Sequence, residues 1–357
     1  MKLDNLQVLR AIAAYAVVLV HVEDIEAKRF DGRILGDWAN AGLWGVDLFF
    51  VISGFVMVLV SQNTLGSARD AGKFLWSRAT RIYPLWWICL SALVPIWLFR
   101  PELVYGGTQH EINFLKDYLL IPKSESPLLQ TGWTLIHEMY FYIVFAALLL
   151  VPLGAQRRIL LIAVWGLLAV GAGFLLNPSK GDAPVLRLIT SPMTLEFVAG
   201  AFAAYFWQAT RGAMGATALV AGVAALALGF FGDLNDTLSG LATSGVNPDW
   251  ERVILFLPGA ALLTYGAASV ELRRGWKVTG PFVKLGDWSY SLYLTHMLSA
   301  NAIGVAWGAF AVPGLVDNVF GLAAVLGGCT LVGWLSFRFL EQPVIRAAKS
   351  MSGKMFA

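Results

Sequence analysis

Charged side chains are scarce in this 357-residue chain: they make up 14% of the residues, whereas hydrophobic residues make up 57%. A globular domain usually carries about 25% charged residues, so this chain has too little polar surface to cover a water-facing body. The net charge of +3 is also too small to indicate a nucleic-acid partner. These shortages exclude a soluble domain and predict a protein embedded in the lipid bilayer.

Cysteine is nearly absent as well. Cys89 and Cys329 are the only two, and both lie inside apolar runs. The sequence therefore predicts no disulfide framework and no metal site, because neither cysteine has neighbouring ligands. A cleavable leader is not expected either, since the first apolar run ends at residues 21–24 in His-Val-Glu-Asp rather than in small residues.

Long apolar runs alternate with short charged connectors, and runs near 20 residues match the thickness of the hydrocarbon core. They predict an all-α bundle of about ten transmembrane helices in a single domain, 1–357. The predicted spans are 5–22, 43–60, 82–99, 133–153, 159–176, 188–207, 213–231, 253–270, 288–311 and 317–337. Helix boundaries in 177–215 stay open, because prolines interrupt the pattern there. In the long connector 100–132, the pattern at 112–120 predicts a short amphipathic helix on the outer surface.

The basic residues predict the orientation of the bundle. With a cytoplasmic N-terminus, 17 of the 26 lysines and arginines fall on the cytoplasmic side and 9 fall outside. The positive-inside rule therefore favours cytoplasmic N- and C-termini, including a short tail at 340–357. We expect a multi-pass protein of the cell's inner (cytoplasmic) membrane.

Ionisable side chains inside the spans are candidate functional groups, because each costs at least ~2.5–3.5 kcal/mol at the centre of a helix. The predicted spans place four of them at outer-leaflet depth, on four helices: His21, Asp47, Glu138 and Glu196. This shared depth predicts one pocket that is open to the outside, binds a sugar and is rimmed by Trp133. Simpler interpretations stay open, because the carboxylates can hydrogen-bond neighbouring helices and His21 or Trp133 can anchor the membrane interface.

The basic candidates Arg10, Arg78 and Arg81 lie toward the cytoplasmic ends of the predicted spans. Arg10 and His21 are eleven residues apart, which is close to three helical turns, so both project from one face of a helix and are separated by roughly 16 Å. Arg78 and Arg81 share a face just before the third span. Arginine suits phosphate, so these three arginines predict a polyphosphate cofactor, although positive-inside anchoring also explains Arg78 and Arg81. His296 is expected to be a buried, hydrogen-bonded histidine.

Seven motifs in order resemble those of the acyltransferase family 3 membrane proteins, in particular the exopolysaccharide-production (ExoZ-like) branch. The matching segments are Leu6–Ala14 with His21, Gly45–Phe55, Arg78–Pro84, Gly132–Leu135 with Glu138–Tyr142, Leu195–Phe197, Tyr290–His296 and Phe339–Pro343. They extend over almost the whole chain.

This resemblance implies an O-acyltransferase. An acyl group, most commonly acetyl in the family, would move from cytoplasmic acyl-CoA to a hydroxyl of an extracytoplasmic, membrane-associated or lipid-linked glycan. The family's catalytic histidine corresponds to His21 and its donor segment to Arg78 and Arg81, with Arg10 as the partner of His21. Many relatives carry a fused extracytoplasmic esterase-like domain, and this sequence contains no such segment. We therefore expect this chain to transfer the acyl group unaided.

Imidazole suits general-base work near neutral pH, so His21 is expected to take the proton of the acceptor hydroxyl while Glu138 or Asp47 orients its ring. An acyl-histidine intermediate is the alternative route. Two other functions stay open from the residues alone: a proton-coupled transporter or flippase, and a non-catalytic scaffold. Neither the acceptor sugar nor the oligomeric state follows from the sequence.

Overall fold

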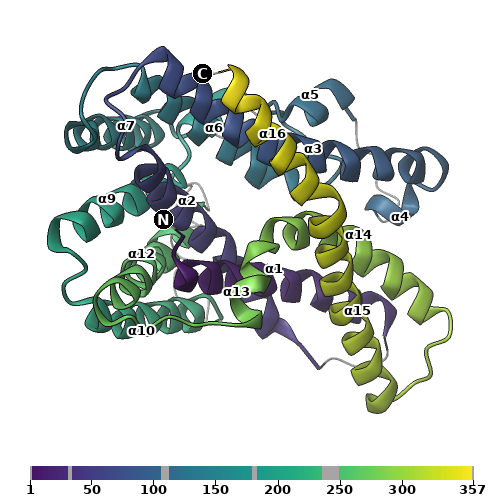
Figure 1. The fold of residues 1–357 in the computed structure, drawn as a ribbon. Helices are drawn as coiled ribbons and strands as arrows, with labels where there is room; N and C mark the ends of the chain where they lie inside the picture. Colours follow the sequence, from purple (N-terminus) through teal and green to yellow (C-terminus); the bar gives the residue numbers. More distant parts are fainter. Residues whose placement is uncertain (1, 31–33, 106–111, 179–182, 235–248, 356–357) are drawn as a thin grey trace.

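The structure is a computed structural model that describes residues 2–30, 34–105, 112–178, 183–234 and 249–355. Its described part contains helices and no strand (Figure 1). The elements are α1 (Asp4–Arg29), η1 (Asp37–Leu43), α2 (Trp44–Ser61), α3 (Ala68–Phe99), α4 (Glu102–Tyr105), α5 (Phe114–Leu119), α6 (Gly132–Leu149), α7 (Ala155–Leu176), α8 (Pro184–Ile189), α9 (Thr194–Thr210), α10 (Gly215–Leu234), α12 (Asp249–Arg274), α13 (Pro281–Asp287), α14 (Ser289–Gly308), α15 (Leu315–Ser336), η2 (Phe337–Glu341) and α16 (Gln342–Met355).

Each of the ten predicted spans coincides with one long helix. Within the described residues, eight helical stretches are long and apolar enough to cross a membrane, which confirms a polytopic helical bundle. The other two predicted spans correspond to α1 and α14. Both carry polar side chains that are buried against neighbouring helices, such as Glu26 on α1 and His296 on α14.

Several boundaries differ from the prediction. Helix α1 continues to Arg29, beyond the predicted 22. Helix α3 begins at Ala68, before the predicted 82, because Ser67 caps its first turn by accepting a hydrogen bond from the Asp70 amide at 3.1 Å. The uncertain segment before α9 forms the separate short helix α8, which starts at Pro184. The C-terminal tail is helical: α15 continues through η2 into α16.

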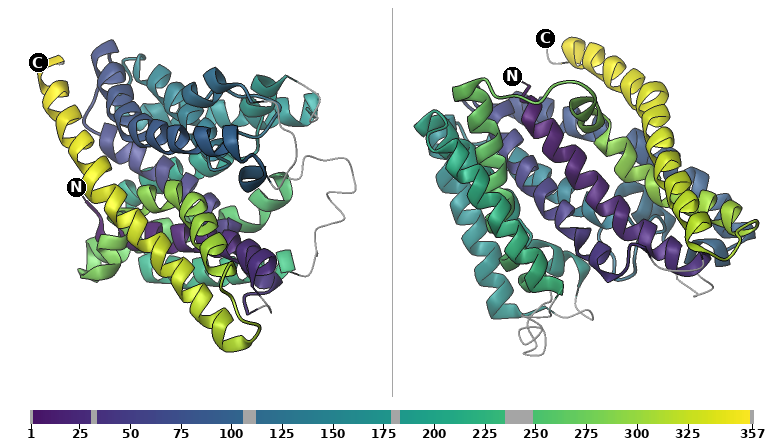
Figure 2. Two further views of the ribbon diagram at one scale, coloured as in Figure 1. Left: turned by 90° about the vertical axis from the view of Figure 1, so that its right-hand side faces the viewer. Right: turned by 90° about the horizontal axis from the view of Figure 1, so that it is seen from below.

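Helix α1 lies near the middle of the bundle and packs against α2, α12, α13, α14 and α15 (Figures 1 and 2). Next to it, α2 crosses α9 where Gly54 faces the Phe197 carbonyl and Gly200 faces the Val51 carbonyl. A Cβ atom on either glycine would overlap that carbonyl, so glycine permits this close approach.

Both termini lie at the same end of the bundle (Figure 2), as an even number of crossings requires. The predicted short helix in the first connector is present as α5. It is attached to α3, because Trp86 Nε1 donates to the Asp117 carbonyl at 2.9 Å. The Asp117 carboxylate also forms an ion pair, at 2.6 Å, with Lys123 of the connector that follows α5. This contact fixes the start of the segment that leads into α6.

Candidate active site

Three cavities lie end to end along α1. The basic cavity, lined by Lys2, Arg10 and Arg81 among others, has a volume of about 850 Å³. The middle cavity, around Glu138, is the smallest of the three, with a volume of about 90 Å³. The histidine cavity, around His21, has a volume of about 530 Å³. The basic and middle cavities share Arg10, Arg78 and Arg81, and the middle and histidine cavities share Val46 and Tyr293. Neighbouring cavities therefore share walls, and the three form a series, called the route below, along the face of α1 that carries Arg10 and His21.

The basic cavity lies at the end of the bundle where both termini are found, since Lys2 and Gly353 both line it. Among the described residues, six basic side chains line it against two acidic ones. The basic residues are Lys2, Arg10, Lys73, Arg78, Arg81 and Lys349, and the acidic residues are Asp287 and Glu341. One acidic group is already paired, because Asp287 forms an ion pair with Lys2 at 2.7 Å. The cavity thus favours a multiply charged anion.

Helices α3 and α16 form a large part of the wall of the basic cavity. Helix α3 contributes residues 73, 76, 77, 80 and 81, which have the i, i+3, i+4 spacing of one helical face, together with Arg78. Helix α16 lies across this face, and Trp76 Nε1 donates to the Ala348 carbonyl at 3.2 Å. Lys349 therefore reaches the same cavity as Lys73. Sequence reasoning missed both lysines, because hydropathy does not predict how the tail packs.

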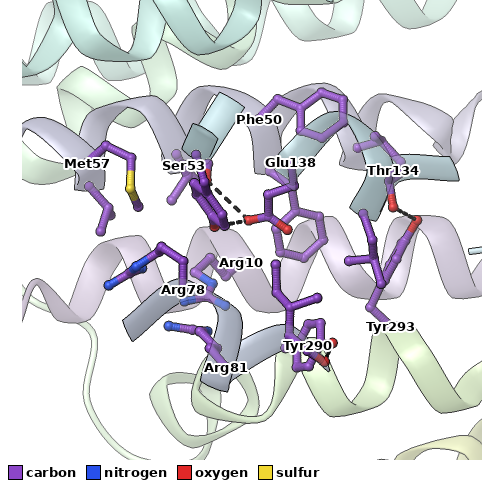
Figure 3. A pocket seen from close by; sticks show the side chains of 17 residues that line it. Arg10, Phe50, Ser53, Met57, Arg78, Arg81, Thr134, Glu138, Tyr290 and Tyr293 are labelled. Carbon is purple, nitrogen blue, oxygen red and sulfur yellow. Dashed lines mark hydrogen bonds between the residues drawn. The ribbon is translucent and has the colours of Figure 1, made fainter. Parts of the chain in front are cut away.

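The three predicted donor-binding arginines converge on one end of the middle cavity, and the Thr134–Tyr293 pair closes the other (Figure 3). Arg78 lies over the rings of Phe74 and Tyr142, at 5.8 and 5.9 Å. Its Nε is buried without a hydrogen-bond partner in the described part of the chain. A buried guanidinium nitrogen of this kind is available to an anionic ligand.

Glu138 lies between the two ends of the middle cavity (Figure 3). Its Oε1 accepts a short hydrogen bond from the Tyr142 hydroxyl and another from Ser53 Oγ at 3.3 Å. The expected position beside His21 is not what the structure shows, because Glu138 lines the middle cavity and His21 lines the histidine cavity. Helical depth alone did not reveal this separation.

Glu341 is a further site residue that the sequence left without a role. The turn Phe337–Glu341 is π-helical, a local widening that is frequent at functional sites. It places the buried Glu341 carboxylate 2.5 Å from Ser291 Oγ and within electrostatic reach of Arg10 and Arg81. Its position after the last span, in Phe-Leu-Glu-Gln-Pro, was the available signal.

The histidine cavity is lined by His21, Trp133, His137, Arg187, Asp249 and Arg252, together with the connector before α6. Arg252 lies over the Trp133 ring at 5.7 Å, and His137 Nδ1 lies 3.0 Å from the Trp133 carbonyl oxygen. Trp133 therefore lines this cavity, where its contacts hold it in place. The mixture of aromatic and polar groups that line the histidine cavity suits a hydroxyl-rich ligand.

His21 contacts a second histidine. The rings of His21 and His296 have centroids 5.1 Å apart. His296 is fully buried and hydrogen-bonded, as predicted, with Nδ1 2.6 Å from the Tyr293 carbonyl oxygen. The Tyr293 hydroxyl lies 2.7 Å from Thr134 Oγ1, at the junction of the middle and histidine cavities. No group of three or more metal-ligating side chains occurs among the described residues.

Asp47 and Glu196 lie apart from the route. Both are fully buried and belong to neither the histidine cavity nor the middle cavity. Arg252 donates to Asp47 Oδ2 from Nη2 at 2.7 Å and from Nε at 2.9 Å, its Nε lies 3.2 Å from Oδ1, and Glu196 lies beside this pair. The four ionisable groups predicted to share one pocket therefore occupy three places. Asp47 pairs with Arg252, which is 205 residues away in the sequence and itself lines the histidine cavity.

Comparisons with known proteins place the chain in a family. The family model described as "Acyltransferase domain", of acyltransferase family 3, matches residues 3–338. The exopolysaccharide production protein ExoZ of Rhizobium meliloti is 32% identical over 327 residues, which cover 88% of this chain and 93% of ExoZ.

More distant relatives are longer. The putative peptidoglycan O-acetyltransferase YrhL of Bacillus subtilis is 28% identical over 58% of this chain and 34% of its own length. The O-acetyltransferase OatA of Staphylococcus aureus is 23% identical over 96% of this chain and 57% of its own length. No solved structure matches. With a family match over nearly the whole chain and a membrane bundle around a basic and a histidine cavity, this protein belongs to the acyltransferase family 3 of membrane O-acyltransferases.

Proposed function

We propose that this enzyme transfers an acyl group, acetyl in the first instance, from cytoplasmic acyl-CoA to a hydroxyl of an extracytoplasmic or membrane-associated glycan such as an exopolysaccharide. The single observation that carries this proposal is the route of three cavities from the basic cavity to His21. It matches a donor with a polyphosphate at one end and a reactive thioester at the other. The inner membrane and a cytoplasmic position of both termini are part of the proposal, supported by the distribution of basic residues.

Acyl-CoA fits the route in charge and in shape. Its phosphates would bind Arg78, Arg81 and Lys73 in the basic cavity, where cations outnumber carboxylates. Its pantetheine arm would extend through the middle cavity, where Glu138 can accept a hydrogen bond from an amide of the arm. Arg10 and His21 are separated by roughly 16 Å along α1. The arm would thus link the phosphates at the basic cavity to the thioester at His21.

The acceptor hydroxyl would enter the histidine cavity. His21 takes the hydroxyl proton as the oxygen forms a bond to the thioester carbonyl carbon. The carbon–sulfur bond then breaks, and the CoA thiolate receives the proton from His21. An acyl-histidine intermediate is the alternative order of the same bond changes. Trp133 and the polar groups beside it, including Arg252, would hold the sugar.

Purified protein in lipid nanodiscs tests this function. We expect it to move labelled acetyl from acetyl-CoA onto oligosaccharides prepared from a chemically deacetylated bacterial exopolysaccharide, with release of one free thiol per acetyl. His21→Ala should abolish transfer and leave acetyl-CoA affinity nearly unchanged. Asn301→Ala is the control, because Asn301 is exposed on α14 and lines none of the three cavities. Undiminished transfer by His21→Ala would remove His21 as the base.

A further inference from the structure

The ring packed against His21 in the structure is that of another histidine, while Asp24, one turn along α1, pairs with Lys28 at 4.0 Å. The two carboxylates expected to orient its ring are engaged elsewhere: Asp47 with Arg252, and Glu138 with Tyr142. His296 is the ring that lies against His21, with a centroid separation of 5.1 Å and an interplanar angle of 37°. It is fully buried on α14, behind the wall of the histidine cavity.

The hydrogen-bond partner of His296 fixes which of its nitrogens carries the proton. Nδ1 lies 2.6 Å from the Tyr293 carbonyl oxygen, and a carbonyl oxygen only accepts hydrogen bonds, so Nδ1 donates. In the neutral ring, Nε2 is then an acceptor. This Nε2 is buried and has no hydrogen-bond partner among the described residues. Buried polar atoms without a partner are uncommon in proteins and call for an explanation.

His21 is within reach of this acceptor. Two imidazole rings joined by an N–H···N bond of about 2.9 Å have centroids roughly 5 Å apart, because each nitrogen lies about 1.1 Å from its ring centre. The observed 5.1 Å equals this separation. The χ2 torsion of histidine is broad, so a rotation of the His21 ring at the cavity wall suffices to align one N–H with Nε2 of His296.

We propose that His296 is the positioning residue for His21: its neutral Nε2 accepts one N–H of His21, so that the other nitrogen of His21 faces the cavity as the base. This inference rests on the proposed function. During transfer, His21 takes the proton of the acceptor hydroxyl while the oxygen–carbon bond forms. The carbon–sulfur bond breaks, and the proton passes from His21 to the CoA thiolate. A neutral partner holds imidazolium less tightly than a carboxylate does, which favours this second transfer.

Two amide substitutions separate the two hydrogen bonds of His296. The amide of His296→Asn overlays Nδ1, so this variant keeps the bond to the Tyr293 carbonyl and presents nothing at the position of Nε2. The longer His296→Gln places an amide oxygen at the position of Nε2, where it accepts from His21. We expect kcat for acetyl transfer to fall about 10- to 100-fold in His296→Asn, and to be at least tenfold higher in His296→Gln than in His296→Asn. Acetyl-CoA affinity should match wild type in both.

A Gln variant less than tenfold faster than the Asn variant, including the case in which neither turns over, overturns the proposal. Loss of acetyl-CoA affinity in both variants also overturns it, because His296 would then be needed only for packing. In a His21→Ala background the two variants should be equal, since the positioned ring is gone. If His21→Ala itself retains full transfer, the proposed function fails. If it is inactive while Asn equals Gln, only the positioning role fails.

Discussion

Replacing Arg81 by alanine should weaken the binding of acyl-CoA, which carries phosphates, and should hardly affect a donor that lacks them. Arg81 lines both the basic and the middle cavity. A hydrogen bond to a charged group contributes about 1.5–3 kcal/mol, and each 1.4 kcal/mol is a factor of ten. Arg81→Ala should therefore lower kcat/KM for acetyl-CoA by about 10- to 150-fold, mainly through KM.

The choice of donor separates phosphate binding from any general damage to the fold. S-acetylpantetheine carries the same thioester and arm without the nucleotide phosphates. Its kcat/KM should be low but nearly equal in wild type and Arg81→Ala. Arg346→Ala is the matched control: Arg346 is exposed on α16, bonds Gln342 at 2.9 Å and does not line the basic cavity. Equal losses with both donors, or an equal effect of Arg346→Ala, would refute the assignment of phosphates to the basic cavity.

Three further outcomes are expected. Glu138→Gln should raise KM for acetyl-CoA more than it lowers kcat, because Glu138 lines the middle cavity and does not lie beside His21. A fall in kcat larger than the rise in KM, measured in steady-state kinetics, would instead indicate that Glu138 takes part in the acyl transfer. Asp47→Ala should lower the melting temperature, because it leaves the partly exposed Arg252 without its carboxylate partner. Asp47→Ala/Arg252→Met should recover part of this loss in thermal unfolding, and an unchanged melting temperature in the single variant would contradict the expectation. In a background without Cys89 and Cys329, an impermeant thiol reagent should label Ser126→Cys from outside the cell and Ser350→Cys only after permeabilisation; the opposite pattern would invert the topology.

The long helices were predictable because each apolar run must match the hydrocarbon thickness, whatever it packs against. The start of α3 was not, because 68–81 mixes charges with apolar residues and has no hydropathy signal of a span. Its face is apparent only when α16 is seen to cover it. The face shared by Arg10 and His21 was predictable, since helical spacing within one element fixes it.

Partners on different helices were beyond the sequence. Depth along a helix grouped Asp47 with His21, but depth does not say which neighbour a side chain faces. Arg252 pairs with Asp47 from α12, and His296 meets His21 from α14. Both pairings depend on how the helices pack around α1. The Tyr-Leu-Thr-His segment that contains His296 was noticed as a motif, yet its spacing contains nothing that links it to His21.

Sidedness of transfer tests the central claim most directly, because the route begins at the end where both termini lie and leads to His21. Membrane vesicles are prepared in both orientations from an exopolysaccharide-producing bacterium that lacks its own acetyltransferase and expresses this chain. Labelled acetyl-CoA, which does not cross the membrane, is added outside. We predict that the label appears in glycan inside inverted vesicles, is absent in right-side-out vesicles, and disappears from the inverted vesicles with His21→Ala. Equal labelling of intact right-side-out vesicles would contradict a route that begins on the cytoplasmic side.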